Sequence, residues 1–111
     1  MIKNSAAEMA QSLASGSTTS VALTQAHLDR ITEVDGKVHA FLHVDTQGAL
    51  KQAADVDAAR ARGEKLSPLA GVPLALKDVL AQRGVPTTAG SKILQGWRPP
   101  YDSTVVANLK K

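Results

Sequence analysis

Cysteine is absent from this chain of 111 residues, which excludes disulfide bonds, thiol catalysis and zinc sites built on thiolates. Aromatic residues are nearly absent as well, since Phe41, Trp97 and Tyr101 are the only three. Any core must therefore consist mainly of Leu, Val, Ile and Ala. Aliphatic or aromatic residues never occur more than three in succession, so the sequence predicts neither a membrane span nor a signal peptide. We therefore expect a cytoplasmic protein without membrane attachment.

Acidic residues are scarce in the second part of the chain. Residues 1–65 carry seven basic and eight acidic side chains, whereas residues 66–111 carry six basic side chains and only Asp78 and Asp102 as acids. The overall charge of +3 is too small to indicate nucleic-acid binding and is typical of a soluble protein. The change near residue 65 divides the chain into an N-terminal helical segment with one short strand and a second segment rich in Gly and Pro.

Helix signals dominate the first part. Ser5 and Glu8 have the spacing of a capping box, in which each side chain accepts a hydrogen bond from the backbone amide of the other residue. Apolar residues that recur every three or four positions predict helices over 6–15, 20–34 and 46–62.

Caps and stop signals delimit the predicted helices. Each of the first three is expected to end at a glycine: Gly16, the pair Asp35-Gly36, and Gly63. The second helix is expected to be capped within Ser17–Ser20, and the third by Asp45 or Thr46. A fourth helix is predicted over 103–111, capped by Asp102 or Ser103. No Gly or Pro follows it, which indicates a fragment of something longer.

Two segments are predicted to be strands, which makes the expected fold class α/β. Apolar residues alternate with other residues from Val38 to Val44, and this period of two predicts a short strand over 38–44. The run from Leu74 to Leu80 is apolar except for Lys77 and Asp78, and it predicts a buried strand over 73–79. Pro73 fits the first position of that strand.

Lys77 is the residue most open to a chemical role. A lysine inside an apolar run must either extend its ammonium group to water or be retained for its chemistry. Burial would favour the neutral amine, which can accept a proton near neutral pH. The alternative is a structural lysine with an exposed head group. Asp78 would point to the opposite face of the strand, so we expect it to cap the following turn rather than to pair with Lys77.

No metal or cofactor site is indicated in this chain. His39 and His43 share a face of the first predicted strand, but catalytic zinc needs three protein ligands and no third lies nearby. The segment 84–92 lacks the Gly-Lys-Ser/Thr frame of a phosphate-binding loop. Its hydroxyl groups have no His or acid at the spacing of a catalytic constellation.

Three segments in the second part closely resemble the start of the amidase signature family: Leu69–Asp78, Thr87–Leu94 and Pro100–Val106. The resemblance extends through His39–Val44 to nearly the whole chain. In that family the lysine of the Leu-Lys-Asp segment is the base of a Ser, cis-Ser, Lys triad, and Lys77 alone matches a triad position here. Both serines belong to a Gly/Ser-rich segment further along. Many relatives carry cysteine where Ala89 stands, a departure that leaves the triad untouched.

The resemblance implies that residues 66–111 are the incomplete start of a mixed-sheet α/β core. The N-terminal helices would pack around that sheet. Because the serines, the oxyanion-hole glycines and most of the sheet lie outside the chain, we expect these 111 residues alone to be inactive.

Within this family the chain is most similar to the glutaminase subunits of tRNA-dependent amidotransferases. The resemblance implies a parent protein that hydrolyses glutamine to supply ammonia for amidating Glu-tRNA(Gln) or Asp-tRNA(Asn). It also implies amidotransferase B and C subunits as partners, misacylated tRNA bound through the complex, and ATP and Mg²⁺ used by a partner subunit. Two alternatives stay open: a stand-alone amidase acting on small amides, and a non-catalytic helical interaction module. The segment Tyr101–Val106 favours the tRNA enzyme.

Overall fold

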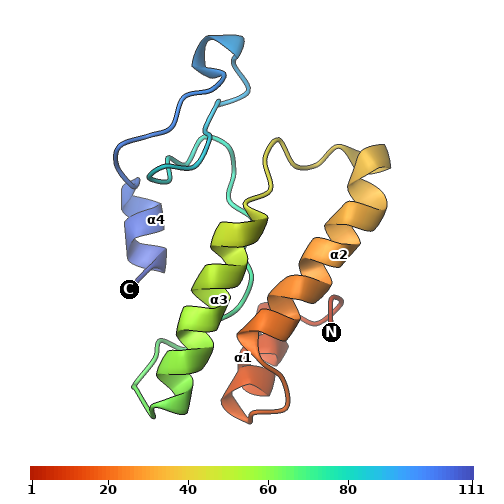
Figure 1. The fold of residues 1–111 in the computed structure, drawn as a ribbon, viewed down its shortest axis with the longest axis vertical. Helices are drawn as coiled ribbons and strands as arrows, with labels where there is room; N and C mark the ends of the chain where they lie inside the picture. The colour runs from red at the N-terminus through yellow and green to blue at the C-terminus, as the bar shows by residue number, and fades with distance from the viewer. The chain divides into compact units, whose positions relative to one another are not determined.

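In the computed structural model, which describes all 111 residues, the chain forms two units, Met1–Leu74 and Ala75–Lys111. The first unit contains the helices α1 (Ala6–Ala14), α2 (Ser20–Val38) and α3 (Thr46–Ala61) (Figure 1). The second contains a single turn of 3-10 helix, η1 (Lys92–Leu94), and the short helix α4 (Thr104–Leu109). None of the helices combines the length and the apolar character that crossing a bilayer requires.

The predicted capping box begins α1. The backbone N–H of Ser5 donates to Glu8 Oε2 at 2.7 Å, and the N–H of Glu8 donates to Ser5 Oγ at 3.3 Å. The hydrogen bond from the Ser5 backbone holds the pKa of Glu8 below its ordinary value. The predicted stop signals at Gly16 and Gly63 are also confirmed, because both residues have positive φ directly after the caps of α1 and α3.

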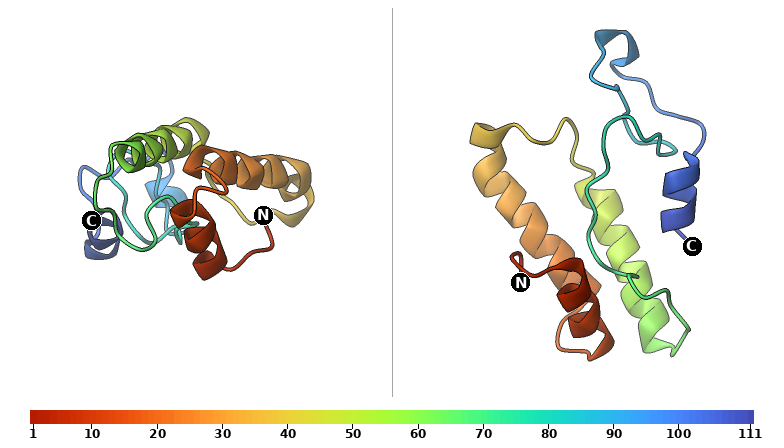
Figure 2. Two further views of the ribbon diagram at one scale, coloured as in Figure 1. Left: turned by 90° about the horizontal axis from the view of Figure 1, so that it is seen from below. Right: turned by 180° about the vertical axis from the view of Figure 1, so that it is seen from behind.

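Helices α2 and α3 run side by side in opposite directions, and α1 lies against the N-terminal half of α2 (Figures 1 and 2). The buried core joins Met9 and Leu13 of α1 to Leu23 of α2, and Val72 packs against them. Because Val72 packs against this apolar cluster, the segment after α3 is attached to the helices.

Polar contacts close the end of the helical unit at which α2 begins. Ser20 Oγ donates to the carbonyl of Gly71 at 2.8 Å, and Arg60 Nη2 donates to the carbonyl of Ala70 at 3.1 Å. Gly71 has a φ of 92°, and a Cβ there would lie 3.0 Å from Ser20 Cβ and Oγ and 3.2 Å from Val56 Cγ1. The close approach of this segment to α2 and α3 therefore requires glycine.

The strand predicted over 38–44 is wrong. Helix α2 continues through Asp35-Gly36 to Val38, and His39 ends it with a left-handed φ of 54°. The Asp35 carboxylate then accepts hydrogen bonds from the backbone amides of Ala40 at 2.7 Å and Phe41 at 3.4 Å. A single glycine inside a helix costs only about 1 kcal/mol relative to alanine, so the helical pairing of α2 with α3 outweighs the stop signal.

The strand predicted over 73–79 is also wrong. The segment has no ladder partner, and Leu74 and Val79 are 64% and 54% exposed. Strands are held by hydrogen bonds to a neighbouring strand, and these 111 residues supply none to this segment. The structure therefore contains helices without a sheet, and the expected α/β core is not seen.

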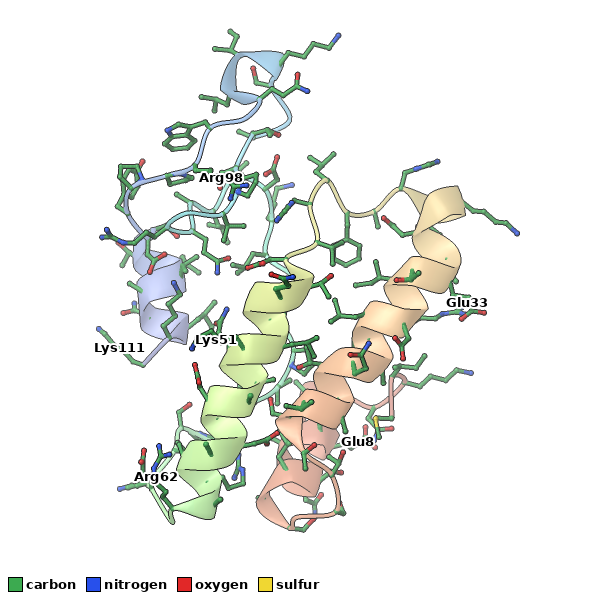
Figure 3. All side chains as sticks on the ribbon, in the orientation of Figure 1. Glu8, Glu33, Lys51, Arg62, Arg98 and Lys111 are labelled. Atoms are coloured by element: carbon green, nitrogen blue, oxygen red, sulfur yellow. The ribbon has the colours of Figure 1, made fainter.

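The second unit is built from two irregular stretches, 81–87 and 97–103, joined by backbone hydrogen bonds. Gly84 N donates to the carbonyl of Pro99 at 2.9 Å, and Thr87 N to that of Trp97 at 3.2 Å. The guanidinium of Arg98, labelled in Figure 3, adds a hydrogen bond from Nη1 to the carbonyl of Gly84 at 2.6 Å. These bonds replace a regular ladder and hold the unit together.

Helix α4 begins at one of the two predicted caps. Ser103 Oγ accepts a hydrogen bond from Val106 N at 3.3 Å, whereas Asp102 accepts from the backbone of Arg83 at 2.7 Å and from Lys110 Nζ at 2.8 Å. The Lys110 ammonium and the Arg83 amide hold the pKa of Asp102 below its ordinary value. Asp102 thus ties α4 to the stretch that begins at Ala81.

Candidate active site

Lys77 lies in the second unit at the start of a turn, where its carbonyl accepts a hydrogen bond from Leu80 N at 2.9 Å. Its side chain is exposed, and Nζ has no hydrogen-bond or ion-pair partner. The burial expected for a lysine in an apolar strand is therefore not observed, because the surrounding run is itself exposed. The ammonium group reaches water, as the structural alternative requires.

Asp78 makes the most densely connected contacts of this segment. Its carboxylate accepts hydrogen bonds from Thr88 N at 3.0 Å, from Thr88 Oγ1, and from Gly90 N at 3.3 Å. Its own carbonyl accepts one from Ala89 N at 3.0 Å. The expectation that Asp78 caps the turn following it is therefore wrong. The residue instead binds three consecutive amides ten to twelve positions further along the chain.

Residues 88–91 form a turn with an unusual residue in it. Ser91 N donates to the carbonyl of Thr88 at 2.8 Å, and the two central residues, Ala89 and Gly90, have φ values of 49° and 70°. Positive φ at both central positions defines a type I′ turn, which favours Asn, Asp and Gly. Alanine carries the steric cost of a left-handed conformation at the first of these positions.

The electrostatics of this cluster favour an ionised Asp78. The Thr88 hydroxyl, the Thr88 amide and the Gly90 amide donate to the carboxylate and hold its pKa below the ordinary value. Successive backbone N–H groups in a turn form a concavity that binds anions, and here the anion is a side chain of the same chain.

No nucleophile is brought to Lys77. Thr87 is buried and donates to the carbonyl of Val85, Thr88 donates to Asp78, and Ser91 Oγ accepts from Ile93 N at the start of η1. Each hydroxyl between 87 and 91 therefore has a structural hydrogen-bond partner. His39 and His43 lie in the first unit at the end of α2 and in the connection to α3. The His, Asp and Glu side chains form no group of three or more that could hold a metal.

Two contacts escaped sequence reasoning, one at the candidate site and one in the helical unit, and both join residues far apart in the chain. Asp78 binds Thr88 and Gly90, and Asp57 binds the first amides of α2 across 36 and 37 positions. A capping box has a fixed spacing of three residues, but these contacts have no fixed spacing. The one available signal was the pair of isolated acids, Asp78 and Asp102, in an otherwise basic segment.

Comparison with known proteins identifies relatives over nearly the whole chain. The family model described as Amidase matches residues 22–111. The A subunit of glutamyl-tRNA(Gln) amidotransferase from Salinispora tropica is 67% identical over 106 residues, covering 96% of this chain, and that from Streptomyces coelicolor is 64% identical over 110 residues, covering 99%. The chain spans 22% of the length of each of these relatives.

A solved structure shares the backbone arrangement. One chain of a complex described as vestigial, and as revealing the evolutionary origins of an s-triazine catabolic enzyme, matches with a TM-score of 0.90 and 37% identity. The match covers 96% of this chain and 24% of that one.

Proposed function

Because the chain belongs to the amidase family, we propose that it is the N-terminal part of the glutaminase subunit of a tRNA-dependent amidotransferase. The identity of 67% to the A subunit of such an amidotransferase, over 96% of the chain, is the observation that carries this proposal. The matched family region contains Lys77 and the Asp78 cluster. The whole protein would hydrolyse glutamine and supply ammonia for converting Glu-tRNA(Gln) or Asp-tRNA(Asn) to the amidated form.

Lys77 is the general base in this proposal. A serine hydroxyl is a weak nucleophile until a base takes its proton. The neutral amine of Lys77 would accept the proton of a bridging serine, which in turn accepts the proton of the nucleophilic serine. The nucleophilic oxygen then bonds to the carboxamide carbon of glutamine. The proton held by Lys77 returns through the bridging serine to the amide nitrogen, the C–N bond breaks, and ammonia leaves. Water hydrolyses the resulting ester and releases glutamate.

Both serines belong to sequence outside these 111 residues, so the neutral amine also depends on surroundings that the rest of the protein provides. The exposed Lys77 side chain is consistent with this requirement, since its Nζ has no hydrogen-bond or ion-pair partner within its own unit. Desolvation of an amine favours its neutral form. Contact with the remainder of the protein would therefore convert an exposed lysine into a base.

The partners in this proposal are the amidotransferase B and C subunits, with misacylated tRNA bound through the complex. In this proposal ATP and Mg²⁺ are used by a partner subunit and not by this chain. A cytoplasmic location accompanies this role.

The test is glutamine hydrolysis by the full-length protein, purified alone and with its partner subunits. We expect ammonia release to rise when partner subunits, ATP and misacylated tRNA are present, and the ammonia to appear as Gln-tRNA or Asn-tRNA. A rate of ammonia release that is the same with and without the partner subunits and the tRNA would contradict the proposal.

A stand-alone amide hydrolase is the second candidate, because the family model that matches residues 22–111 is described only as Amidase. It would share the fold and Lys77. Unassisted hydrolysis of simple amides, with little activity on glutamine, would favour it over the amidotransferase.

A further inference from the structure

We propose that Asp78 is a positioning residue that fixes the backbone of Lys77 against the turn Thr88–Ser91. The inference rests on the proposed function, because it assigns to Asp78 a role in presenting the base of that reaction. Asp78 follows Lys77 directly, so anything that immobilises the Asp78 backbone also restricts the base.

The geometry joins Asp78 to the turn at four points. Three bonds reach the carboxylate, from Thr88 N, Thr88 Oγ1 and Gly90 N, and the fourth joins Ala89 N to the Asp78 carbonyl at 3.0 Å. An ionised carboxylate has only acceptors, so it satisfies all three of its donors at once. Asparagine at this position would present one acceptor oxygen and a donor amide, and at least one of the donors would lose its partner.

The strain at Ala89 supports a functional role for this contact. A non-glycine residue in the left-handed region persists only when surrounding contacts hold it, and such residues cluster at functional sites. The amide of Ala89 and those of its two neighbours all donate to Asp78. The residue that holds the strained turn is therefore the one next to the proposed base.

Little else in the unit holds Lys77. The segment 72–77 has no regular secondary structure, and the bond from Leu80 N to the Lys77 carbonyl lies within the same local turn. The hydrogen bonds of Asp78 are thus the ones that join this part of the chain to residues outside its own turn. A displacement of about 1 Å at a catalytic group can lower a rate by about 100-fold.

Three substitutions in the full-length protein, assembled with its partners, test this role. Asp78→Asn removes the charge and one acceptor at nearly constant volume. Thr88→Val removes the hydroxyl, whereas Thr88→Ser keeps the hydroxyl and removes only the methyl group. Asp102→Asn is the matched control, because Asp102 accepts bonds from the backbone of Arg83 and from Lys110 in the same unit without contacting the turn.

We expect Asp78→Asn to lower kcat for glutamine hydrolysis about 10- to 100-fold with KM changed less than about threefold. Thr88→Val should lower kcat in the same direction, Thr88→Ser should keep it near the wild-type value, and Asp102→Asn should leave it unchanged. Amide hydrogen exchange at residues 88–90 should accelerate in Asp78→Asn and not in Asp102→Asn.

A wild-type kcat in Asp78→Asn, together with a loss of activity in Lys77→Ala, would overturn the inference while leaving the proposed function intact. Equal losses in Asp78→Asn and Asp102→Asn, in proportion to lost folded protein, would also overturn it. Wild-type protein without glutaminase activity would overturn both the inference and the proposed function.

Discussion

The carboxylate of Asp57, on α3, accepts a hydrogen bond from the backbone amide of Ser20 at 2.8 Å and so caps α2 from another helix. Its second oxygen accepts from Val21 N at 2.9 Å. The first amides of a helix lack partners within the helix, and the positive end of the helix dipole adds attraction for a carboxylate. Asp57 thereby joins the C-terminal part of α3 to the N-terminus of α2, at one end of the antiparallel helix pair.

Replacing Asp57 by alanine should lower the free energy of unfolding of the chain by about 1 to 3 kcal/mol, because two amides lose a charged acceptor. Urea denaturation followed by circular dichroism measures this change. Asp55→Ala is the control, since Asp55 only forms an exposed i,i+4 pair with Lys51 and should change stability by about 0.5 kcal/mol or less. Equal effects of the two substitutions would contradict the cap.

Replacing His39 by glycine should stabilise the chain by up to about 1 kcal/mol, because His39 holds a left-handed φ of 54° that glycine adopts without steric cost. The melting temperature measures the effect. Lys37→Gly is the matched control and should destabilise by about 0.5 to 1 kcal/mol, since Lys37 lies inside α2. A loss of stability in both variants would show that the left-handed residue is not under strain.

The acid titration of the turn at 88–91 should follow Asp78. Hydrogen bonds lower the pKa of this carboxyl in the folded state, so their contribution to stability is present above the ordinary pKa of 3.8 and is lost as pH falls through the folded value. The amide chemical shifts of Thr88 and Gly90 should stay constant from neutral pH down to about 4 and then titrate with a midpoint below 3.8. Asp78→Asn should abolish this titration, and a midpoint above 3.8 would contradict the contacts.

Replacement of Lys77 in the full-length protein distinguishes a base from a structural cation. Arginine keeps the charge but does not deprotonate in proteins, and alanine removes both properties. If Lys77 is the base, glutaminase turnover should fall by about 10²- to 10⁴-fold in both variants while thermal unfolding changes little. A folded Lys77→Arg enzyme that retains activity would refute the assignment.

The 111 residues alone should not hydrolyse glutamine or form an adduct with an electrophilic glutamine analogue. Every hydroxyl between residues 87 and 91 has a structural partner, and a base without a nucleophile and an oxyanion hole has no bond to form. Mass spectrometry after incubation with the analogue tests this. Stoichiometric labelling of any Ser or Thr would disprove it.

The helices were predictable because their signals are local. Ser5 and Glu8 lie within one turn, and Ser103 lies directly before the helix that it caps. The strand predictions were wrong for the opposite reason. The alternation over 38–44 suits a strand, but a strand also requires hydrogen bonds to a neighbouring strand, and a local pattern does not supply that neighbour. Local helix propagation and the Asp35 cap determined the conformation instead.

Of the candidate site, the sequence predicts only Lys77 and not the contacts around it. Lys77 stands out as a charge in an apolar run, but its exposure depends on which segments cover that run. The Asp78 contacts depend on a turn ten residues away whose central alanine has an unfavourable conformation for its type. Sequence preference alone argues against that turn, and the hydrogen bonds that stabilise it are tertiary.

The close approach at Gly71 limits which amino acids natural variation can place there. Any side chain at Gly71 would enter the space of Ser20 and Val56 and would also require a φ that L-residues avoid. Selection should therefore remove substitutions of Gly71. Gly36 lies in α2 with nothing within 4 Å of its missing Cβ, and alanine there should be tolerated or favoured. Two glycines of the same helical unit should therefore diverge at very different rates among descendants of this sequence.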